Sequence, residues 1–386
     1  MTVVDTSESA GSGLKLSVSP EELDVILSMK SGDPAVKEHL VDAHIVDYFS
    51  WEYQASREPL HRLYEKAKRS QWNATTDIDW SIEVDQEKVA ADNGAAAGAG
   101  IVEAFARIAE DPHSPIGNWG PEELIQMGVH MQNWTLSNFL HGEQGALLCT
   151  ARIVEVVPDM DAKYYASTQV MDEARHVEVF SRYLDEKLGG KFPINPHLEA
   201  LLDDILVDSR WDMTYLGMQI MVEGLALAAF GFIHAMTTEP LLKQILRYVM
   251  SDEARHVAFG VMALKDVYAD LTQAEIRERQ EFAYEAALRM RNRFLQQEVW
   301  EAMGVDPKKM VPLTIDLPER RMFQSVLFSK IVPNTKKLGL LDAGDGWLRE
   351  KFTDLGVIQF EDWVDTSVEY ETLDALDGGN RSEQPS

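Results

Sequence analysis

The sequence predicts an all-α protein built around a four-helix bundle. The hexapeptide Asp-Glu-Ala-Arg-His-Val occurs twice, 80 positions apart, and strand signals are weak along the chain. Each copy follows a lone glutamate at the same interval, which is 30 residues from Glu143 to Glu173 and again from Glu223 to Glu253. This interval fits one antiparallel helical hairpin, so the repeat indicates two hairpins that pack together.

A Glu-x-x-His pair lies inside each hexapeptide. Residues i and i+3 share one face of a helix, so each pair directs a carboxylate and an imidazole to the same side. With the two lone glutamates they supply four carboxylates and two imidazoles, the ligand set of bundles that bind two iron or manganese ions. Oxygen and nitrogen donors suit these metals, and the chain offers no thiolate cluster that would select zinc or copper(I). The candidate ligands are Glu143, Glu173, His176, Glu223, Glu253 and His256.

The alternative interpretation of this pattern is a pair of surface salt-bridge ladders. The surroundings of Glu223 argue against it, because residues 216–232 are almost wholly apolar and would bury this carboxylate. A buried carboxylate without a partner is costly, and metal coordination offsets that cost. A single protonated core glutamate is an ordinary alternative, but repetition in two hairpins disfavours it.

An aspartate precedes each ligand pair, and its position predicts a supporting role. Ligating imidazoles usually donate their second N–H to a carboxylate or a carbonyl. We expect Asp252 to accept from His176 and Asp172 to accept from His256, across the bundle. Salt bridges to the arginine of each hexapeptide are an alternative that is compatible with this one.

Capping and turn residues place the remaining elements in order. A helix start is expected at Ser19, before a proline, and helical periodicity near 45–70 and 85–110. The first hairpin is expected from Gly120 to Gly189, with a break at Pro158. A Pro-rich link then leads to the second hairpin, at about 208–237 and 240–270, and a capping box at Thr272 opens a helix to about Met303. The expected divisions are a disordered N-terminus (1–18), a helical extension (19–119), the bundle (120–270), C-terminal helices packed on it (271–360) and an acidic tail (361–386).

Composition excludes some partners. The formal net charge of −28 would repel nucleic acid, although an acidic face could dock a basic electron-donor protein. The single cysteine, Cys149, fits a reducing cytoplasm, and the first residues lack the features of a signal peptide. Residues 216–236 are a membrane candidate, but the charge of Glu223 favours a buried core helix.

From about Glu122 to Asp270 the chain resembles the ferritin-like dimetal carboxylate superfamily. Within it, the motifs at Asp172-Glu173-Ala-Arg-His176 and Asp252-Glu253-Ala-Arg-His256 resemble the ribonucleotide reductase small-subunit-like group. This group includes bacterial multicomponent monooxygenase hydroxylase subunits and arylamine N-oxygenases. The resemblance implies a ferritin-like four-helix bundle with flanking helices, the same six ligands, two metal ions that react with dioxygen, and a homodimer.

Two departures limit what the resemblance implies. Class I reductase subunits that store a tyrosyl radical place the tyrosine four residues after the first ligand histidine, where this chain has Phe180. Arylamine N-oxygenases carry a further histidine ligand one turn before the last Glu-x-x-His, where this chain has Val249. We therefore expect no tyrosyl radical of that kind, and the resemblance does not extend to a seventh protein ligand.

Side chains one helical turn from each ligand are expected to line a cavity beside the metals. Most of them are apolar, which suits a hydrophobic substrate, although ordinary core packing explains them equally well. The repeat pairs Phe180 with Gly260, so we expect the cavity to open beside the glycine. The predicted lining residues are Phe139, Leu140, Leu147, Gln169, Val170, Phe180, Gln219, Ile220, Leu227, Val249 and Gly260.

These observations favour a dioxygen-activating, non-haem di-iron oxidoreductase that acts on a small, hydrophobic organic molecule. A Mn/Fe pair is an alternative cofactor, and an electron-donor reductase is an expected partner. The competing functions are a ferroxidase or iron-storage protein, a Mn/Fe oxidase without a stable tyrosyl radical, and a non-catalytic metal-binding protein. The tryptophans between Trp51 and Trp80 are expected to anchor a helix on the bundle rather than to form a lid or an electron-transfer wall.

Overall fold

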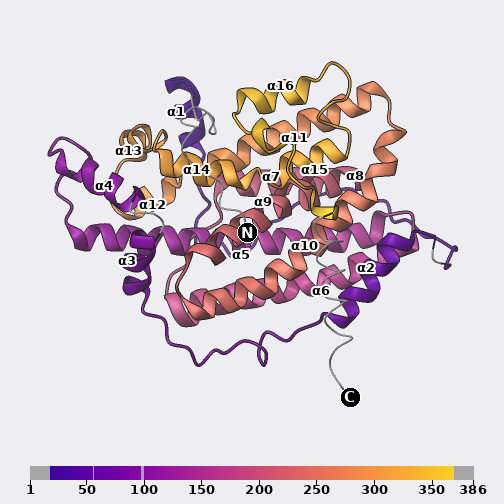
Figure 1. Ribbon diagram of the computed structural model, residues 1–386, viewed down its shortest axis with the longest axis horizontal. Helices are drawn as coiled ribbons and strands as arrows, with labels where there is room; N and C mark the ends of the chain where they lie inside the picture. Colours follow the sequence, from indigo (N-terminus) through magenta and orange to yellow (C-terminus); the bar gives the residue numbers. More distant parts are fainter. Residues whose placement is uncertain (1–17, 55, 97–99, 369–386) are drawn as a thin grey trace.

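The computed structural model describes residues 18–54, 56–96 and 100–368 (Figure 1). Regular structure within these residues is entirely helical, as the sequence predicts. The expected disorder of residues 1–18 falls almost wholly outside the described part of the chain, as does most of the acidic tail. At the start of that tail, Thr366 is buried and its backbone N–H donates to Asn334 Oδ1 at 3.0 Å.

Two helical hairpins form the centre of the molecule. In the first, α5 (Pro121–Val156) pairs with α6 (Met160–Tyr183), which continues into the π-helical turn η1 (Leu184–Leu188). In the second, α8 (Trp211–Tyr215), the π-helical segment η2 (Leu216–Val222) and α9 (Glu223–Met236) form one continuous helix that pairs with α10 (Pro240–Ala269). Helix α5 spans most of the width of the molecule in Figure 1. The bounds agree with the two predicted hairpins.

Local sequence explains where these helices begin. Asp159 caps α6 by accepting the N–H of Ala162 at 2.8 Å. Glu239 caps α10 by accepting the N–H groups of Leu241 and Leu242, and proline occupies the first position of both α5 and α10. Each cap satisfies N–H groups that the helix itself leaves without acceptors.

Shorter helices cover the bundle on several sides. Helix α2 packs on α6 and α10, α7 packs on α5 and α11, and α11 also packs on η2 and α16. These covering elements are α1 (Pro20–Ser28), α2 (Glu58–Arg69), α3 (Gln86–Ala96), α4 (Gly100–Glu110), α7 (Pro196–Val207), α11 (Gln273–Arg293), α12 (Gln297–Ala302), α13 (Pro307–Thr314), α14 (Pro318–Leu327), α15 (Ile331–Lys337), α16 (Trp347–Asp354) and the 3-10 turn η3 (Ile358–Phe360).

Several predicted boundaries are wrong. Residues 45–54 are not helical, and their aromatic side chains, such as Phe49 and Trp51, are exposed rather than packed on the bundle. The helix expected to run to Met303 is interrupted after Arg293, where Gln296 adopts a φ of 54°, a left-handed conformation uncommon for residues other than glycine.

Two further predictions need correction. The Pro-rich link between the hairpins leads into a helix, α7, because Asn195 caps it and Pro196 occupies its first position. The segment 85–110 forms two helices, α3 and α4, with residues 97–99 outside the described part.

The continuous helix Trp211–Met236 is long and apolar enough to cross a membrane, with a hydropathy of 1.7 over its most apolar window. However, 78% of that window is buried inside the protein, where it packs against α10 and α11. Burial by other helices explains its composition, so it is a core helix of the bundle.

Candidate metal centre

The two hairpins bring all six predicted ligands together in the interior. Glu143 comes from α5, and the Glu-x-x-His pairs come from α6 and α10. Glu223 is the first residue of α9, directly after the π-helical segment η2, a type of helix distortion that is frequent at functional sites. All six side chains are buried, with Glu143 the most exposed at 5%.

The donor atoms fall into two overlapping groups. Glu143, Glu173, His176 and Glu253 form one group, in which the ligand atoms lie within 4.8 Å of one another. Glu173 is shared with the second group, which also contains Glu223 and His256. Glu173 could therefore contribute a ligand atom to either of two metal ions.

Both imidazoles turn Nδ1 toward the carboxylates. His176 Nδ1 lies 3.1 Å from Glu253 Oε1 and 3.2 Å from Glu143 Oε2. His256 Nδ1 lies 3.0 Å from Glu173 Oε1 and 3.7 Å from Glu253 Oε2. Glu173 and Glu253 therefore approach both halves of the centre, and each histidine belongs to one half.

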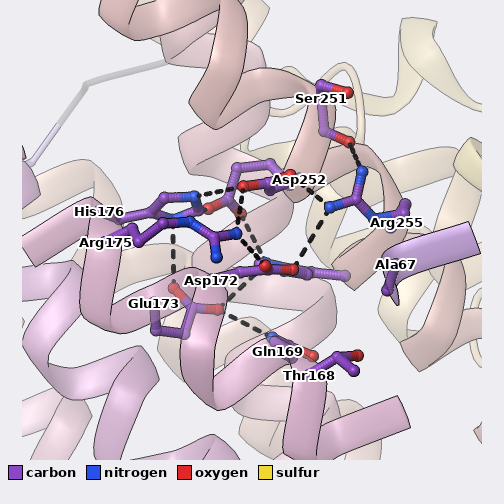
Figure 2. Close-up of polar contacts among 12 residues, drawn as sticks. Ala67, Thr168, Gln169, Asp172, Glu173, Arg175, His176, Ser251, Asp252 and Arg255 are labelled. Carbon is purple, nitrogen blue, oxygen red and sulfur yellow. Dashed lines mark hydrogen bonds and ion pairs between the residues drawn. The ribbon is translucent and has the colours of Figure 1, made fainter. Parts of the chain in front are cut away.

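The opposite ring nitrogens face the two aspartates across the bundle, and Figure 2 shows the contact of His176 with Asp252. His176 Nε2 lies 3.3 Å from Asp252 Oδ2, and His256 Nε2 lies 3.2 Å from Asp172 Oδ2. These carboxylates also pair with the hexapeptide arginines, Arg175 with Asp172 and Arg255 with Asp252. Both arrangements that the sequence suggested are thus present together.

A further contact to Asp252 was not predicted. Trp72, which follows α2, donates its indole N–H to Asp252 Oδ2 at 2.8 Å. The same ring stacks on Tyr248 with a centroid distance of 5.0 Å and lies over Arg175. The sequence shows only a tryptophan in a turn-rich segment, so its partner could not be read from the spacing.

Unsatisfied atoms in this cluster fit metal ions. Both carboxylate oxygens of Glu253, Glu173 Oε2 and His256 Nδ1 are buried without a well-oriented hydrogen bond, although imidazole and carboxylate atoms of the cluster lie as close as 3.0–3.1 Å. Such groups are rare in folded proteins unless a cation or another ligand satisfies them. Four carboxylate and two imidazole donors in a buried pocket suit iron or manganese.

The shifted pKa values of the clustered side chains also fit metal binding. Burial, together with the neighbouring Glu253, raises the pKa of Glu143 to about 8. Burial and the Glu173 carboxylate also raise the pKa of Glu223 well above its usual range. Burial alone would lower the pKa of His176, but Glu143 and Asp252 raise it well above its ordinary value. Protons thus supply the positive charge that this cluster requires, and metal ions would displace them.

Two glutamines hold the carboxylate of Glu223. Gln169 Nε2 donates to Glu173 Oε1 and to Glu223 Oε1, both at 2.9 Å. Gln219, with its amide nitrogen turned toward Glu223, donates to that carboxylate at 2.8 Å. These two residues were predicted as cavity lining, and their amides instead hold the carboxylate of a predicted ligand.

A small cavity of about 20 Å³ adjoins the cluster. This volume is sufficient for one water-sized or dioxygen-sized molecule. Of the predicted lining residues, Phe139 lines it, whereas Phe180 packs against Phe139 in the core with a ring distance of 6.2 Å. Its walls are formed by Asn138, Phe139, Gly142, Glu143, Ala146, Val222, Glu223, Ala226, Glu253 and Arg293.

The predicted opening beside Gly260 is wrong. A Cβ atom at this position would lie 2.5 Å from Gln219 Cβ and 3.2 Å from Ile220 Cδ1. The glycine therefore permits close packing of α10 against the π-helical segment η2, and no open space remains there. Among the other predicted lining residues, Leu140, Ile220, Leu227 and Val249 are buried in the core, and Leu147 and Val170 are half-buried.

A larger cavity of about 260 Å³ lies further along the same helices, α5 and α9. In the sequence, Phe139 lies between the α5 residues that line the larger cavity and most of those that line the smaller one. Its ring packs edge-on against the ring of Phe230, with a centroid distance of 4.7 Å. The larger cavity is lined by Met131, Gln132, Thr135, Leu136, Phe232, Ile233, Met236, Thr237, Leu242 and Phe323. The amide atoms of Gln132 are buried there without a hydrogen-bond partner.

The chain is similar to a known protein family and to several solved structures. The model of the P-aminobenzoate N-oxygenase AurF family matches residues 53–339. No functionally curated protein matches the chain.

Similar solved structures include an R2-like ligand-binding oxidase with an aerobically reconstituted Mn/Fe cofactor. It is 19% identical to this chain, with a TM-score of 0.45. The match covers 74% of this chain and 93% of the oxidase. A second is an R2-like ligand-binding oxidase with an aerobically reconstituted metal cofactor after photoconversion, with 18% identity, a TM-score of 0.44, and coverage of 72% and 93%.

Proposed function

The chain belongs to the P-aminobenzoate N-oxygenase AurF family, and from this premise we propose how its residues serve the reaction. As a member of this family with a buried carboxylate and histidine cluster, it is a dioxygen-dependent dimetal oxidoreductase with a ferritin-like fold. The observation that carries the proposal is the pair of overlapping donor groups that share Glu173.

The proposed ligands divide into residues that hold one ion and residues that serve both. Glu143 and His176 would hold one metal ion, and Glu223 and His256 the other. Glu173 and Glu253 approach both histidines, so they would help to hold both ions. The positions take two iron ions or a Mn/Fe pair, which would supply the electrons for reduction of dioxygen.

The surrounding residues hold this centre in place. Asp252 and Asp172 accept the Nε2 proton of His176 and His256, which keeps Nδ1 free to coordinate. The two glutamine amides fix the carboxylate of Glu223. The apolar part of the small cavity wall, formed by Phe139, Ala146, Val222 and Ala226, would limit the access of water to this site.

We propose the cavity of about 260 Å³ as the place where a small organic substrate binds. A cavity of about 150 Å³ accommodates benzene, so this one would accept a ring with substituents or a short acyl chain. Apolar walls and a few polar groups, such as Gln132 and Thr135, are typical of small-molecule sites. An aromatic amine is the first candidate, because the family name includes p-aminobenzoate, and monooxygenation is the first reaction to test.

We also propose an electron donor, an oligomeric state and a cellular compartment for this protein. A reductase would supply electrons, and a basic one would suit the net charge of −28. Homodimerisation is proposed from the superfamily resemblance. A reducing cytoplasm is proposed because Cys149, the single cysteine, is buried as a free thiol.

The test is anaerobic loading with Fe(II), metal counting and stopped-flow absorbance on mixing with dioxygen. About two irons per chain and a rapid absorbance change are expected. Glu223→Ala should lose about one iron and most of that change, because it removes a ligand of one ion. Glu178→Ala is the matched control, since this glutamate is exposed on the same helix as Glu173.

Failure to bind iron or manganese, or a loaded centre that dioxygen leaves unchanged, would refute the proposal. Uptake of iron far above two ions per chain during turnover would favour the ferroxidase function instead.

A further inference from the structure

The cavity of about 260 Å³ contains a polar group that the fold leaves unsatisfied. Gln132, on α5, lines this cavity, and its amide nitrogen and oxygen are both buried without a hydrogen-bond partner. A buried polar group without a partner destabilises a protein, whereas an apolar side chain of the same size would not. We therefore expect the Gln132 amide to meet a partner that is not part of the chain.

The other polar side chains of the cavity wall already have partners. Thr135 donates its hydroxyl to the carbonyl of Met131 at 2.8 Å, a bond that Ser and Thr often make inside helices. Thr237 Oγ1 accepts the backbone N–H of Glu239 at 3.2 Å. The seven remaining lining residues are methionine, leucine, isoleucine and phenylalanine. Among the ten lining side chains, the amide of Gln132 is thus the polar group that still lacks a partner.

The charge of the wall limits what this cavity can bind. None of its ten lining residues, all of which belong to the described part of the chain, is an acid, a base or a histidine. A carboxylate, phosphate or ammonium group would therefore lie there without a counter-charge, and burial of an unpaired charge is strongly unfavourable. The wall favours a neutral ligand with an apolar body and one polar edge.

The chemistry of the glutamine amide defines that polar edge. Its NH2 group donates and its carbonyl oxygen accepts, side by side in one plane. A ligand satisfies both when it presents an acceptor and a donor on neighbouring atoms, as primary amides, lactams and ureas do. A ketone offers only the acceptor, and a carboxylate has no hydrogen to donate, so each would leave the oxygen of Gln132 unpaired.

We propose that the larger cavity binds a neutral organic amide and that Gln132 recognises its amide edge. This inference rests on the proposed function, because it names the chemical class of the substrate. The volume is sufficient: a cavity of about 150 Å³ holds benzene, so one of about 260 Å³ accommodates a benzamide.

The position of Gln132 sets the orientation of such a substrate. Gln132, Phe139 and Glu143 lie on one face of α5, because they are separated by seven and then four residues. The helix rises about 16 Å between Gln132 and Glu143. The amide would therefore lie at the end of the substrate away from the predicted metal ligands. The reacting end would lie toward Phe139, which also lines the small cavity beside those ligands.

The test compares three molecules of similar shape in full-length protein that is loaded anaerobically with Fe(II). 4-Aminobenzamide presents a donor and an acceptor, 4-aminoacetophenone presents only the acceptor, and 4-aminobenzoate carries a negative charge. In isothermal titration, the amide should bind about tenfold or more tightly than the ketone or the acid, because only the amide satisfies both atoms of Gln132. Gln132→Met keeps the length of the side chain, and it should lose the preference for the amide while keeping its affinity for the ketone.

Gln126→Met is the matched control, because this glutamine also lies on α5 and donates to Glu87 Oε1 at 2.9 Å, outside the cavity. It should leave the three affinities unchanged. Thermal unfolding checks folding, and Gln132→Met should be as stable as wild type or more so, because it removes a buried amide that lacks a partner.

Equal binding of the amide and the ketone by the wild type would show that water satisfies Gln132, and it would overturn the inference. Tighter binding of the acid, no binding of the amide, or an unchanged preference in Gln132→Met would overturn it as well. So would oxygenation of the acid in preference to the amide, measured by mass spectrometry after mixing with dioxygen. Protein that does not load metal would refute the dimetal function, and the same titrations of the metal-free protein would still decide whether Gln132 recognises the amide.

Discussion

Replacing Asp252 by asparagine tests how the outer carboxylates support the centre. Asp252 Oδ2 accepts from Trp72 Nε1 at 2.8 Å and lies 3.3 Å from His176 Nε2, while Oδ1 pairs with Arg255. Asparagine keeps the shape but removes the charge, and its NH2 group must face at least one of these donors. Loss of such a partner typically lowers metal affinity 10–100-fold.

The same change also lowers the free energy of unfolding. Breaking a buried ion pair typically costs about 3–5 kcal/mol. We expect the lower end of this range for Asp252→Asn, because Asp172 Oδ2 stays 3.3 Å from Arg255 Nη2 and retains part of the attraction.

Chelator competition with Fe(II) and Mn(II) measures the affinity, and urea unfolding measures the stability. Asp266→Asn is the control on the same helix, since the side chain of Asp266 is 86% exposed. A folded Asp252→Asn protein that binds both metals within about twofold of wild type would show that the aspartate does not support His176.

Three other outcomes follow from the geometry. Gly260→Ala should lower the free energy of unfolding by about 1–3 kcal/mol, because the new Cβ would lie 2.5 Å from Gln219 Cβ. Urea unfolding measures this change. Gly231→Ala is the control, because its Cβ would lie at an ordinary contact distance of 3.7 Å from Met250 Cε. Burial lowers the pKa of His197 to about 4, so the unfolded chain binds a proton below about pH 6.5 that the native protein excludes. Stability on the order of 3 kcal/mol should therefore be present above pH 6.5 and lost as the pH falls toward 4, and His197→Gln should flatten this profile in thermal scans. Trp72→Phe should weaken metal binding less than Asp252→Asn in the same chelator assay, because His176 keeps its carboxylate partner.

The clustering of the six proposed ligand side chains could be predicted because sequence spacing encodes it. Each ligand lies on a regular helix or at its start, so the i, i+3 rule and the 30-residue interval suffice to bring the six side chains together. Trp72 and Arg293 could not be predicted, because each reaches the site from outside the bundle hairpins. Their positions depend on how α2 and α11 pack, which no local pattern specifies.

The prediction of a cavity beside Gly260 is wrong because the helix that precedes Glu223 is not a regular α-helix. Counting one turn back from Glu223 assumes α-helical geometry, but residues Leu216–Val222 form a π-helix with a wider turn. This geometry places Gln219 where it both donates to Glu223 and fills the space beside Gly260. The free volume lies instead beside the small side chains of Ala146 and Ala226. Under the proposed function, a substrate would approach the six predicted ligands between α5 and α9, where this cavity lies.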